Sequence, residues 1–225
     1  MKCLLNATHA LTSGAPSGPP ESELADAEAA KARRKYDTPR VVVVNVETIH
    51  DGDTVRAREP GIAATKHDER VRLQWIDTPE LKQHYGPQAR EALVALVKTY
   101  GRADPASPGD YLLWLVPFGQ DKYDRTMGGL FPWAEATTML PSEKTFERSI
   151  NYLLVVLGFA WLYSHPVWHA GRHENDDGLM PLERAAKAGG LGLWAAGDDA
   201  IMPRWWRRGD RVGATRHLPP YTEFL

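Results

Sequence analysis

The chain has 225 residues, of which 43% are hydrophobic and 25% charged, and this composition supports a packed core and excludes wholesale disorder. Its formal net charge of -2 excludes a polybasic nucleic-acid binder but not a local basic groove. The single cysteine, Cys3, excludes an internal disulfide framework and a structural metal site of several thiolates. Because no apolar run is long enough to cross a bilayer, we expect no membrane partner.

Residues 1–38 are predicted to form an extension, disordered or weakly helical, that precedes the folded domain. Residues 13–20 are rich in Ser, Gly and Pro, and residues 21–35 contain almost no large apolar side chain. The first five residues resemble a signal peptide only faintly, because their apolar stretch ends at Asn6. We therefore give a slight preference to a cytoplasmic location and leave secretion open.

Five short strands are predicted from runs of β-branched, aliphatic and aromatic residues. They cover residues 41–44, 54–57, 71–76, 111–116 and 128–133. The Asp51-Gly52 pair predicts a turn that joins the first two strands as a hairpin. In the third strand, the alternating pattern places Val71, Leu73 and Trp75 on one face.

Three helices are predicted from apolar side chains at helical spacing. They cover residues 87–100, 143–157 and 182–188. The same spacing places Tyr100 and Leu157 at the ends of the core-facing stripes of the first two helices. Five strands before and between helices predict an α+β fold over residues 39–195, a five-stranded OB-fold-like barrel with about three packed helices.

Residues 196–225 are predicted to form a C-terminal tail that follows this domain. Residues 203–217 contain five arginines, two adjacent tryptophans (Trp205 and Trp206) and one acid, Asp210. Such a segment either contacts a nucleic-acid backbone or packs its tryptophans on the domain. We favour packing slightly.

Four short motifs stand in a fixed order: DGDT at residues 51–54, R-x-x-x-x-D-T-P-E at 72–80, YGP at 85–87 and DKYDR at 121–125. Each motif alone is a weak signal, but four in order with barrel-like strands between them form a strong one. The chain therefore resembles the staphylococcal nuclease (thermonuclease) family over about residues 41–195. In that family the last motif reads DKYGR.

Two carboxylates are candidate metal ligands. Asp53 follows a hairpin turn and Asp77 ends a strand, so both can point into one mouth of a barrel, where hard oxygens suit Ca²⁺ or Mg²⁺. Taken alone, either residue is equally typical of a turn that caps its own backbone. The resemblance implies Ca²⁺ as the cofactor, with Asp53, Asp77 and the backbone carbonyl of Thr78 as ligands.

Three further residues are candidates for catalysis. The guanidinium groups of Arg72 and Arg125 can grip a phosphodiester and stabilise the charge that develops at phosphorus. Glu80, which closely follows the strand-end acid, can hold or deprotonate an attacking water. The resemblance implies the same roles for all three.

The resemblance also implies a nucleic-acid-binding surface. Tyr123, Trp161 and Tyr163 match positions that stack on the base beside the scissile bond, and Lys122 matches a lysine near the terminal phosphate. A tyrosine is expected at the position of Trp161, and packing of this tryptophan in the core is an equally supported interpretation.

The sequence departs from the family pattern in three places. The two glycines that flank the arginine of the fourth motif are replaced by Asp124 and Thr126. Only four residues separate Glu80 from Tyr85, so we expect a stiffer loop there. Residues 132–143 are longer than the corresponding hairpin.

Together these features predict a Ca²⁺-dependent endonuclease that hydrolyses phosphodiester bonds of DNA, with RNA left open as a second substrate. The resemblance implies 3′-phosphate ends, and we expect a monomer. The main alternative is a non-catalytic nucleic-acid-binding OB-fold module, which predicts lost acids or arginines, whereas all are present. A zinc-dependent hydrolase built on His165, His169 and His173 is less favoured, because Pro166 and Gly171 would interrupt a helix that aligned them.

Overall fold

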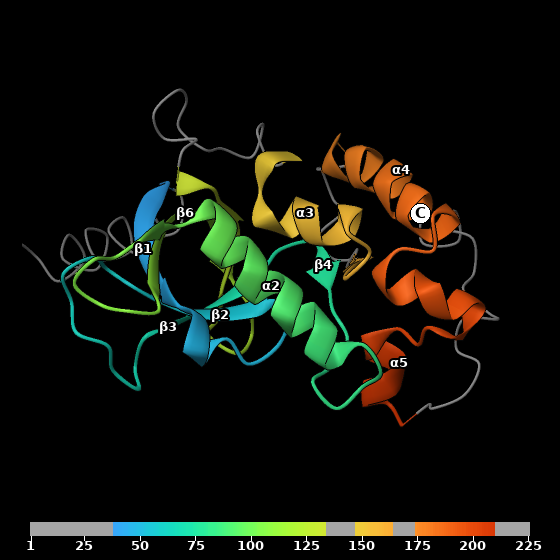
Figure 1. Cartoon of the computed structure of the whole chain (residues 1–225), viewed down its shortest axis with the longest axis horizontal. Helices are drawn as coiled ribbons and strands as arrows, with labels where there is room; N and C mark the ends of the chain where they lie inside the picture. Colours follow the sequence, from blue (N-terminus) through green and yellow to red (C-terminus); the bar gives the residue numbers. More distant parts are fainter. Residues whose placement is uncertain (1–37, 134–146, 164–173, 210–225) are drawn as a thin grey trace, which may run out of the picture. The chain divides into compact units, whose positions relative to one another are not determined.

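The computed structural model describes residues 38–133, 147–163 and 174–209, which all lie in one compact unit, residues 35–225. Five strands form a closed barrel: β1 (Arg40–Asn45), β2 (Thr54–Arg58), β3 (Glu69–Leu73), β6 (Asp110–Gln120) and β7 (Thr126–Phe131). They pair in the order β1-β2-β3-β7-β6, and pairing of β1 with β6 closes the barrel (Figure 1). The predicted OB-fold-like α+β architecture is confirmed.

One pairing within the barrel is parallel, and it sets the position of two candidate arginines. β3 and β7 run in the same direction, with Arg72 opposite Met127, whereas the other barrel pairs are antiparallel. Because Arg125 directly precedes β7, this pairing brings its loop beside the strand that carries Arg72.

The predicted strand over residues 71–76 is wrong in one respect. β3 ends at Leu73, and Trp75 has a left-handed backbone with φ of 62°, so the alternating pattern stops there. Trp75 packs instead on Phe118, with ring centroids 4.7 Å apart. Beyond the break, β4 (Ile76–Asp77) pairs with β8 (Trp161–Leu162) in a separate two-stranded sheet. A short strand, β5 (Arg102–Ala103), extends the barrel sheet at β6.

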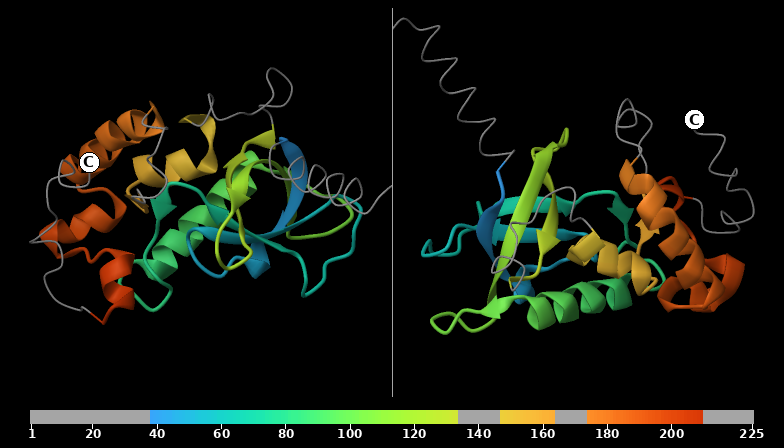
Figure 2. Two further views of the ribbon diagram at one scale, coloured as in Figure 1. Left: turned by 180° about the vertical axis from the view of Figure 1, so that it is seen from behind. Right: turned by 90° about the horizontal axis from the view of Figure 1, so that it is seen from above.

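The helices lie outside the barrel strands (Figure 1). They are α2 (Gly86–Tyr100), α3 (Ile150–Val156), α4 (Glu174–Ala188) and α5 (Pro203–Arg207), with 3₁₀ turns η1 (Val46–Thr48) and η4 (Gly192–Asp199). In the views of Figures 1 and 2, α3 lies between the strands β1 and β2 and the helix α4. No helix in the described ranges is long and apolar enough to span a membrane.

Two predicted core positions are wrong, and one helix begins later than predicted. Tyr100 and Leu157 are 39% and 42% exposed, because each lies at the end of its helix, where the stripe has left the core. α3 begins after Ser149, whose hydroxyl accepts a hydrogen bond from the backbone N–H of Tyr152. Residues 1–37 of the predicted extension, and residues 134–146, lie outside the described ranges.

A second apolar cluster lies outside the barrel core and is built largely by the C-terminal segment. Its buried members are Trp161, Ala186, Leu193, Trp194, Ala200 and Met202. Tyr85 and Trp205 pack against this cluster, half-buried. The segment that follows residue 195 is thus attached to the rest of the unit by side-chain burial.

One buried amide joins three parts of the fold. Asn151 of α3 is fully buried, and its Oδ1 accepts a hydrogen bond from the backbone N–H of Leu130. Its Nδ2 donates to the carbonyl oxygens of Gln74 and Gly128, all three contacts being 3.1 Å long. The amide therefore ties α3 to β7 and to the break between β3 and β4.

We expect Asn151→Ala to lower the free energy of unfolding by about 2–4 kcal/mol, because it leaves several buried backbone groups without a partner. Urea denaturation followed by circular dichroism measures the change. Leu157→Ala, at the residue that caps the C-terminus of the same helix, is the matched control, and its exposed side chain predicts a loss below about 1 kcal/mol. Equal losses in the two variants would contradict this role of the amide.

Candidate active site

The site begins with the turn that precedes β2. Gly52 packs against Thr78 so closely that a Cβ atom on it would lie 2.8 Å from the Thr78 hydroxyl and 2.9 Å from the Ala89 methyl group. This close approach lets Asp53 Oδ2 accept hydrogen bonds from the backbone N–H of Thr78 (2.9 Å) and from its hydroxyl (3.1 Å). The glycine of the DGDT motif is therefore needed to bring the turn onto the end of β4.

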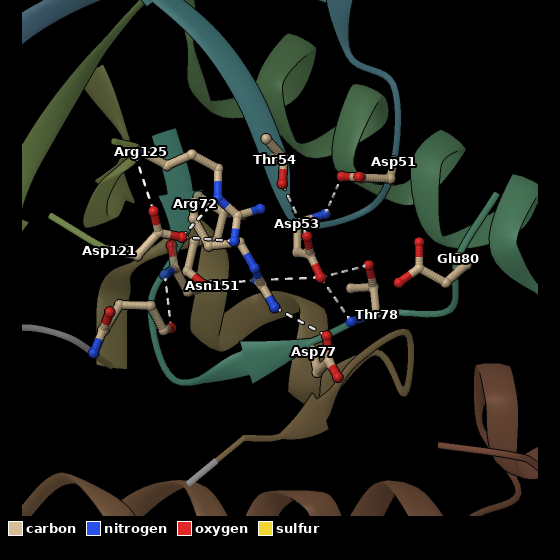
Figure 3. A network of polar contacts seen from close by, with 12 residues as sticks. Asp51, Asp53, Thr54, Arg72, Asp77, Thr78, Glu80, Asp121, Arg125 and Asn151 are labelled. Carbon is tan, nitrogen blue, oxygen red and sulfur yellow. Dashed lines mark hydrogen bonds and ion pairs between the residues drawn. The ribbon is translucent and has the colours of Figure 1, made fainter. Parts of the chain in front are cut away.

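Arg72 joins the two candidate metal ligands. Its Nη1 lies 3.1 Å from Asp53 Oδ2, and its Nη2 donates to Asp77 Oδ1 at 2.9 Å (Figure 3). A further bond from Nη1 to the carbonyl of Leu73 (2.9 Å) fixes the guanidinium. Two acids that are far apart in the sequence thus share one cation, and the side chains of Asp53 and Asp77 are only 9% and 1% exposed.

Burial makes this acidic cluster electrostatically unusual. It raises the pKa of Asp77 to about 6, although the charge of Arg72 opposes the shift. It also raises the pKa of Asp51 to about 6, and the negative charge of Asp53 adds to that shift. Asp51 was not among the predicted site residues, although its Oδ1 accepts a hydrogen bond from the backbone N–H of Asp53 (3.2 Å). The repeated acid of the DGDT motif was the available signal.

Glu80 lies at the open side of the cluster, with a side chain that is 36% exposed. Its carboxylate pairs with Arg207 of α5, with Nη1 2.6 Å from Oε1. The same guanidinium reaches Asp77, with Nη2 3.0 Å from Oδ2. Arg207 was also missing from the predicted site, because only the fold brings the C-terminal segment to it.

Arg125 does not contact the two central acids in this structure. Its Nε and Nη2 each lie 2.7 Å from Oδ2 of Asp121, and its backbone N–H donates to Asp121 Oδ1. Figure 3 draws this pair in the polar network around Arg72. The predicted second arginine is thus near the site, but it is held by a carboxylate of its own loop.

The loop before β7 presents an exposed aromatic ring flanked by cations. Tyr123 is 58% exposed, with Lys122 Nζ 5.0 Å and the Arg125 guanidinium carbon 5.6 Å from its ring centroid. Asp124, with φ of 57°, adopts the left-handed conformation, which explains why the family pattern has glycine there. An exposed ring between positive charges suits a base and its phosphates.

The other two aromatic residues differ in exposure. Trp161 is 1% exposed and packs edge-on against Trp194, with ring centroids 5.5 Å apart. A base cannot stack on a ring that is buried on all sides, so the stacking role predicted for Trp161 is corrected to core packing. Tyr163 is partly buried, and its backbone N–H donates to the carbonyl of Trp75.

The donor chemistry fits a hard divalent cation. Asp53, Asp77 and the Thr78 carbonyl offer only oxygen atoms, which suit Ca²⁺ or Mg²⁺ and not zinc. In the ranges that the structure describes, no group of three or more His, Cys, Asp or Glu side chains is arranged to hold a metal. A cation here would therefore depend on two carboxylates and backbone oxygen. His165, His169 and His173 lie outside the described residues.

We expect Asp51→Asn to stabilise the metal-free protein at neutral pH. The pKa of Asp51 is about 6 in the folded protein, against an ordinary value of 3.8. Between these two pH values the unfolded chain has already lost the proton that the folded protein still holds, so the free energy of unfolding falls as the pH rises through this window. Above it, the buried charge of Asp51 destabilises the folded protein. The variant should match the wild type near pH 4 and exceed it by about 1–2 kcal/mol above pH 7. Melting curves at several pH values measure this.

Asp124→Asn, which removes a charge from an exposed loop residue, controls for the change in net charge. It should leave the dependence of the melting temperature on pH like that of the wild type. A stabilisation of Asp51→Asn that is equal at pH 4 and pH 8 would contradict the burial argument.

Comparisons with known proteins agree with the motifs and the barrel. The family profile described as "Staphylococcal nuclease homologue" matches residues 70–196. Protein ParB of Escherichia coli is 32% identical over 163 residues, which are 72% of this chain and 77% of that protein. A micrococcal nuclease of Shigella flexneri is 30% identical over 166 residues, 74% of this chain and 80% of that protein. An uncharacterized endonuclease of Haemophilus influenzae is 27% identical over 179 residues, 80% of this chain and 78% of that protein. With its motifs joined in one site on this barrel, the chain belongs to the staphylococcal nuclease family.

Proposed function

We propose that the protein is a Ca²⁺-dependent endonuclease that hydrolyses DNA and leaves 3′-phosphate ends, with RNA as a second substrate to be tested. Membership of the family supports a nuclease function and a nucleic-acid substrate. The observation that carries the proposal is the bridge of Arg72 between Asp53 and Asp77, both buried. In this arrangement the guanidinium can bind a phosphate while the two hard carboxylates bind a divalent cation.

Ca²⁺ would be held by Asp53, Asp77 and the carbonyl of Thr78, and when bound it would supply a Lewis acid for the phosphate oxygens. Glu80 is exposed enough to meet water and would take the proton of the attacking water molecule. The water oxygen then bonds to phosphorus while the P–O5′ bond breaks, and its electron pair leaves with the O5′ oxygen, which acquires a proton from solvent.

The two arginines would stabilise the five-coordinate phosphorus through paired N–H donors. Arg72 is already at the acidic cluster, and a phosphate there would share its donors with Asp53 and Asp77. Arg125 would have to leave Asp121 to reach the same phosphate. Tyr123 provides an exposed stacking surface for a base of any identity, which supports cleavage with little sequence preference.

The proposed metal requirement is tested by incubating DNA with the protein in Ca²⁺, Mg²⁺, Zn²⁺ or EDTA and analysing the product ends. We expect cleavage with Ca²⁺, none in EDTA, and 3′-phosphate termini. Asp53→Asn should weaken Ca²⁺ binding at least about tenfold in calorimetry, since one of two carboxylate ligands becomes a neutral amide. Full activity in EDTA would remove the metal from the mechanism, and intact DNA under every condition would favour the non-catalytic binding module.

The catalytic roles predict a separation of turnover from affinity. Arg72→Lys keeps the charge but loses the two-pronged donor, and Glu80→Gln keeps the shape but loses the base, so each should lower kcat about 10²-fold or more. DNA affinity in Ca²⁺-free buffer should change less than about threefold in both variants. Arg102→Lys, on the exposed strand β5, is the matched control and should retain the wild-type kcat. Parallel losses of affinity and turnover would indicate a binding groove.

A further inference from the structure

Arg207, the last residue of α5, contacts two acids of the site. They are Glu80, the proposed base, and Asp77, a proposed metal ligand. Its Nη1 lies 2.6 Å from Glu80 Oε1, and its Nη2 lies 3.0 Å from Asp77 Oδ2. On the other side, Arg72 donates to Asp77 Oδ1 at 2.9 Å. Both carboxylate oxygens of Asp77 are therefore engaged by arginines, and Glu80 is engaged by the second of them.

The fold holds the backbone that carries Arg207 close to the site, so the contact does not depend on the flexible side chain alone. The segment before α5 is held by the burial of Ala200 and Met202 in the second apolar cluster. Gln83 joins this segment to the site, because its Nε2 donates to the carbonyl of Ile201 while its Oε1 accepts from the backbone N–H of Glu80 (3.2 Å). One glutamine thus holds the loop of Glu80 and the C-terminal segment together.

A divalent cation that binds Asp77 competes with the two arginines, because the metal ion and a guanidinium draw on the same carboxylate lone pairs and their positive charges repel each other. Arg72 has a side chain only 14% exposed and is also fixed by Asp53 and the Leu73 carbonyl. Arg207 has a side chain 47% exposed at the end of a short helix. Arg207 is therefore the residue that moves.

We propose that Arg207 is an internal counter-cation of the active site, which neutralises Asp77 and Glu80 in the metal-free protein and competes with the divalent cation for Asp77. This inference rests on the proposed function. Because the cation binds more tightly to the state in which Arg207 has withdrawn, its apparent affinity is lowered by the free energy of breaking the Arg207 contacts. Arg207 thus sets the cation concentration at which Glu80 becomes free to act on water.

The test is calorimetric titration of the full chain with CaCl₂, without nucleic acid. We expect Arg207→Gln to lower the Kd for Ca²⁺ about 3- to 30-fold, since no charge-assisted contact has to be broken first. Arg208→Gln is the matched control: it removes the same charge one residue further along, where the guanidinium lies over the ring of Trp205. Its Kd should stay within about twofold of the wild type. Circular dichroism checks that both variants are folded.

A second measurement follows Arg207 directly. The NMR signal of the Arg207 Nε–Hε group is identified as the one that is present in the wild type and absent from Arg207→Gln. Addition of Ca²⁺ to the wild type should shift this signal. An unchanged or higher Kd in Arg207→Gln, with a wild type that does bind Ca²⁺, would overturn this inference and leave the proposed metal intact. If neither protein binds Ca²⁺, the proposed metal site itself fails. Binding by Arg207→Gln alone would be the strongest support.

Discussion

The guanidinium of Arg72 between Asp53 and Asp77 is the interaction on which the site depends. It requires that the start of β2, the end of β3 and the strand β4 meet within the reach of one side chain. The tight contact of Gly52 with Thr78 brings the first of these elements in, and the left-handed turn at Trp75 redirects the chain after β3. Asn151 then holds that turn against α3. The close contact at Gly52 and the left-handed turn at Trp75 thus have the same consequence, which is to bring Asp53 and Asp77 to the guanidinium of Arg72.

This arrangement is unfavourable for stability when considered alone. Buried carboxylates lose hydration, which is why the pKa values of Asp51 and Asp77 are raised to about 6. Arg72 and Arg207 offset part of that cost by ion pairing with Asp53 and Asp77, but among the described residues neither forms an ion pair with Asp51. Buried acids with raised pKa values are more typical of binding and catalytic sites than of structural cores.

Local patterns were sufficient to predict the strands of the barrel, the helix from residue 87 and the two acids beside Arg72, because each depends on neighbouring residues or on a motif. The failures were non-local. The alternation that ends at Trp75 and the arrival of Arg207 at Asp77 each depend on segments far apart in the sequence. So does the burial of Trp161 against Trp194, which the sequence left open as an alternative to stacking on a base. A tryptophan or an arginine in a sequence carries no sign of which distant residue it will meet.

The arginines of the site are all paired with carboxylates that they would have to exchange, in part, for a phosphate. Each of Arg72, Arg125 and Arg207 is paired with a carboxylate of this chain, so none offers all of its donors to a phosphate in the described state. In the proposed reaction, a divalent cation at Asp53 and Asp77 would supply the positive charge that the arginines supply without it, and would thereby make it less costly for a guanidinium to turn toward an incoming phosphate. Cation and substrate would then favour each other's binding through shared carboxylates, and Glu80, once released by Arg207, would be left with water as its partner.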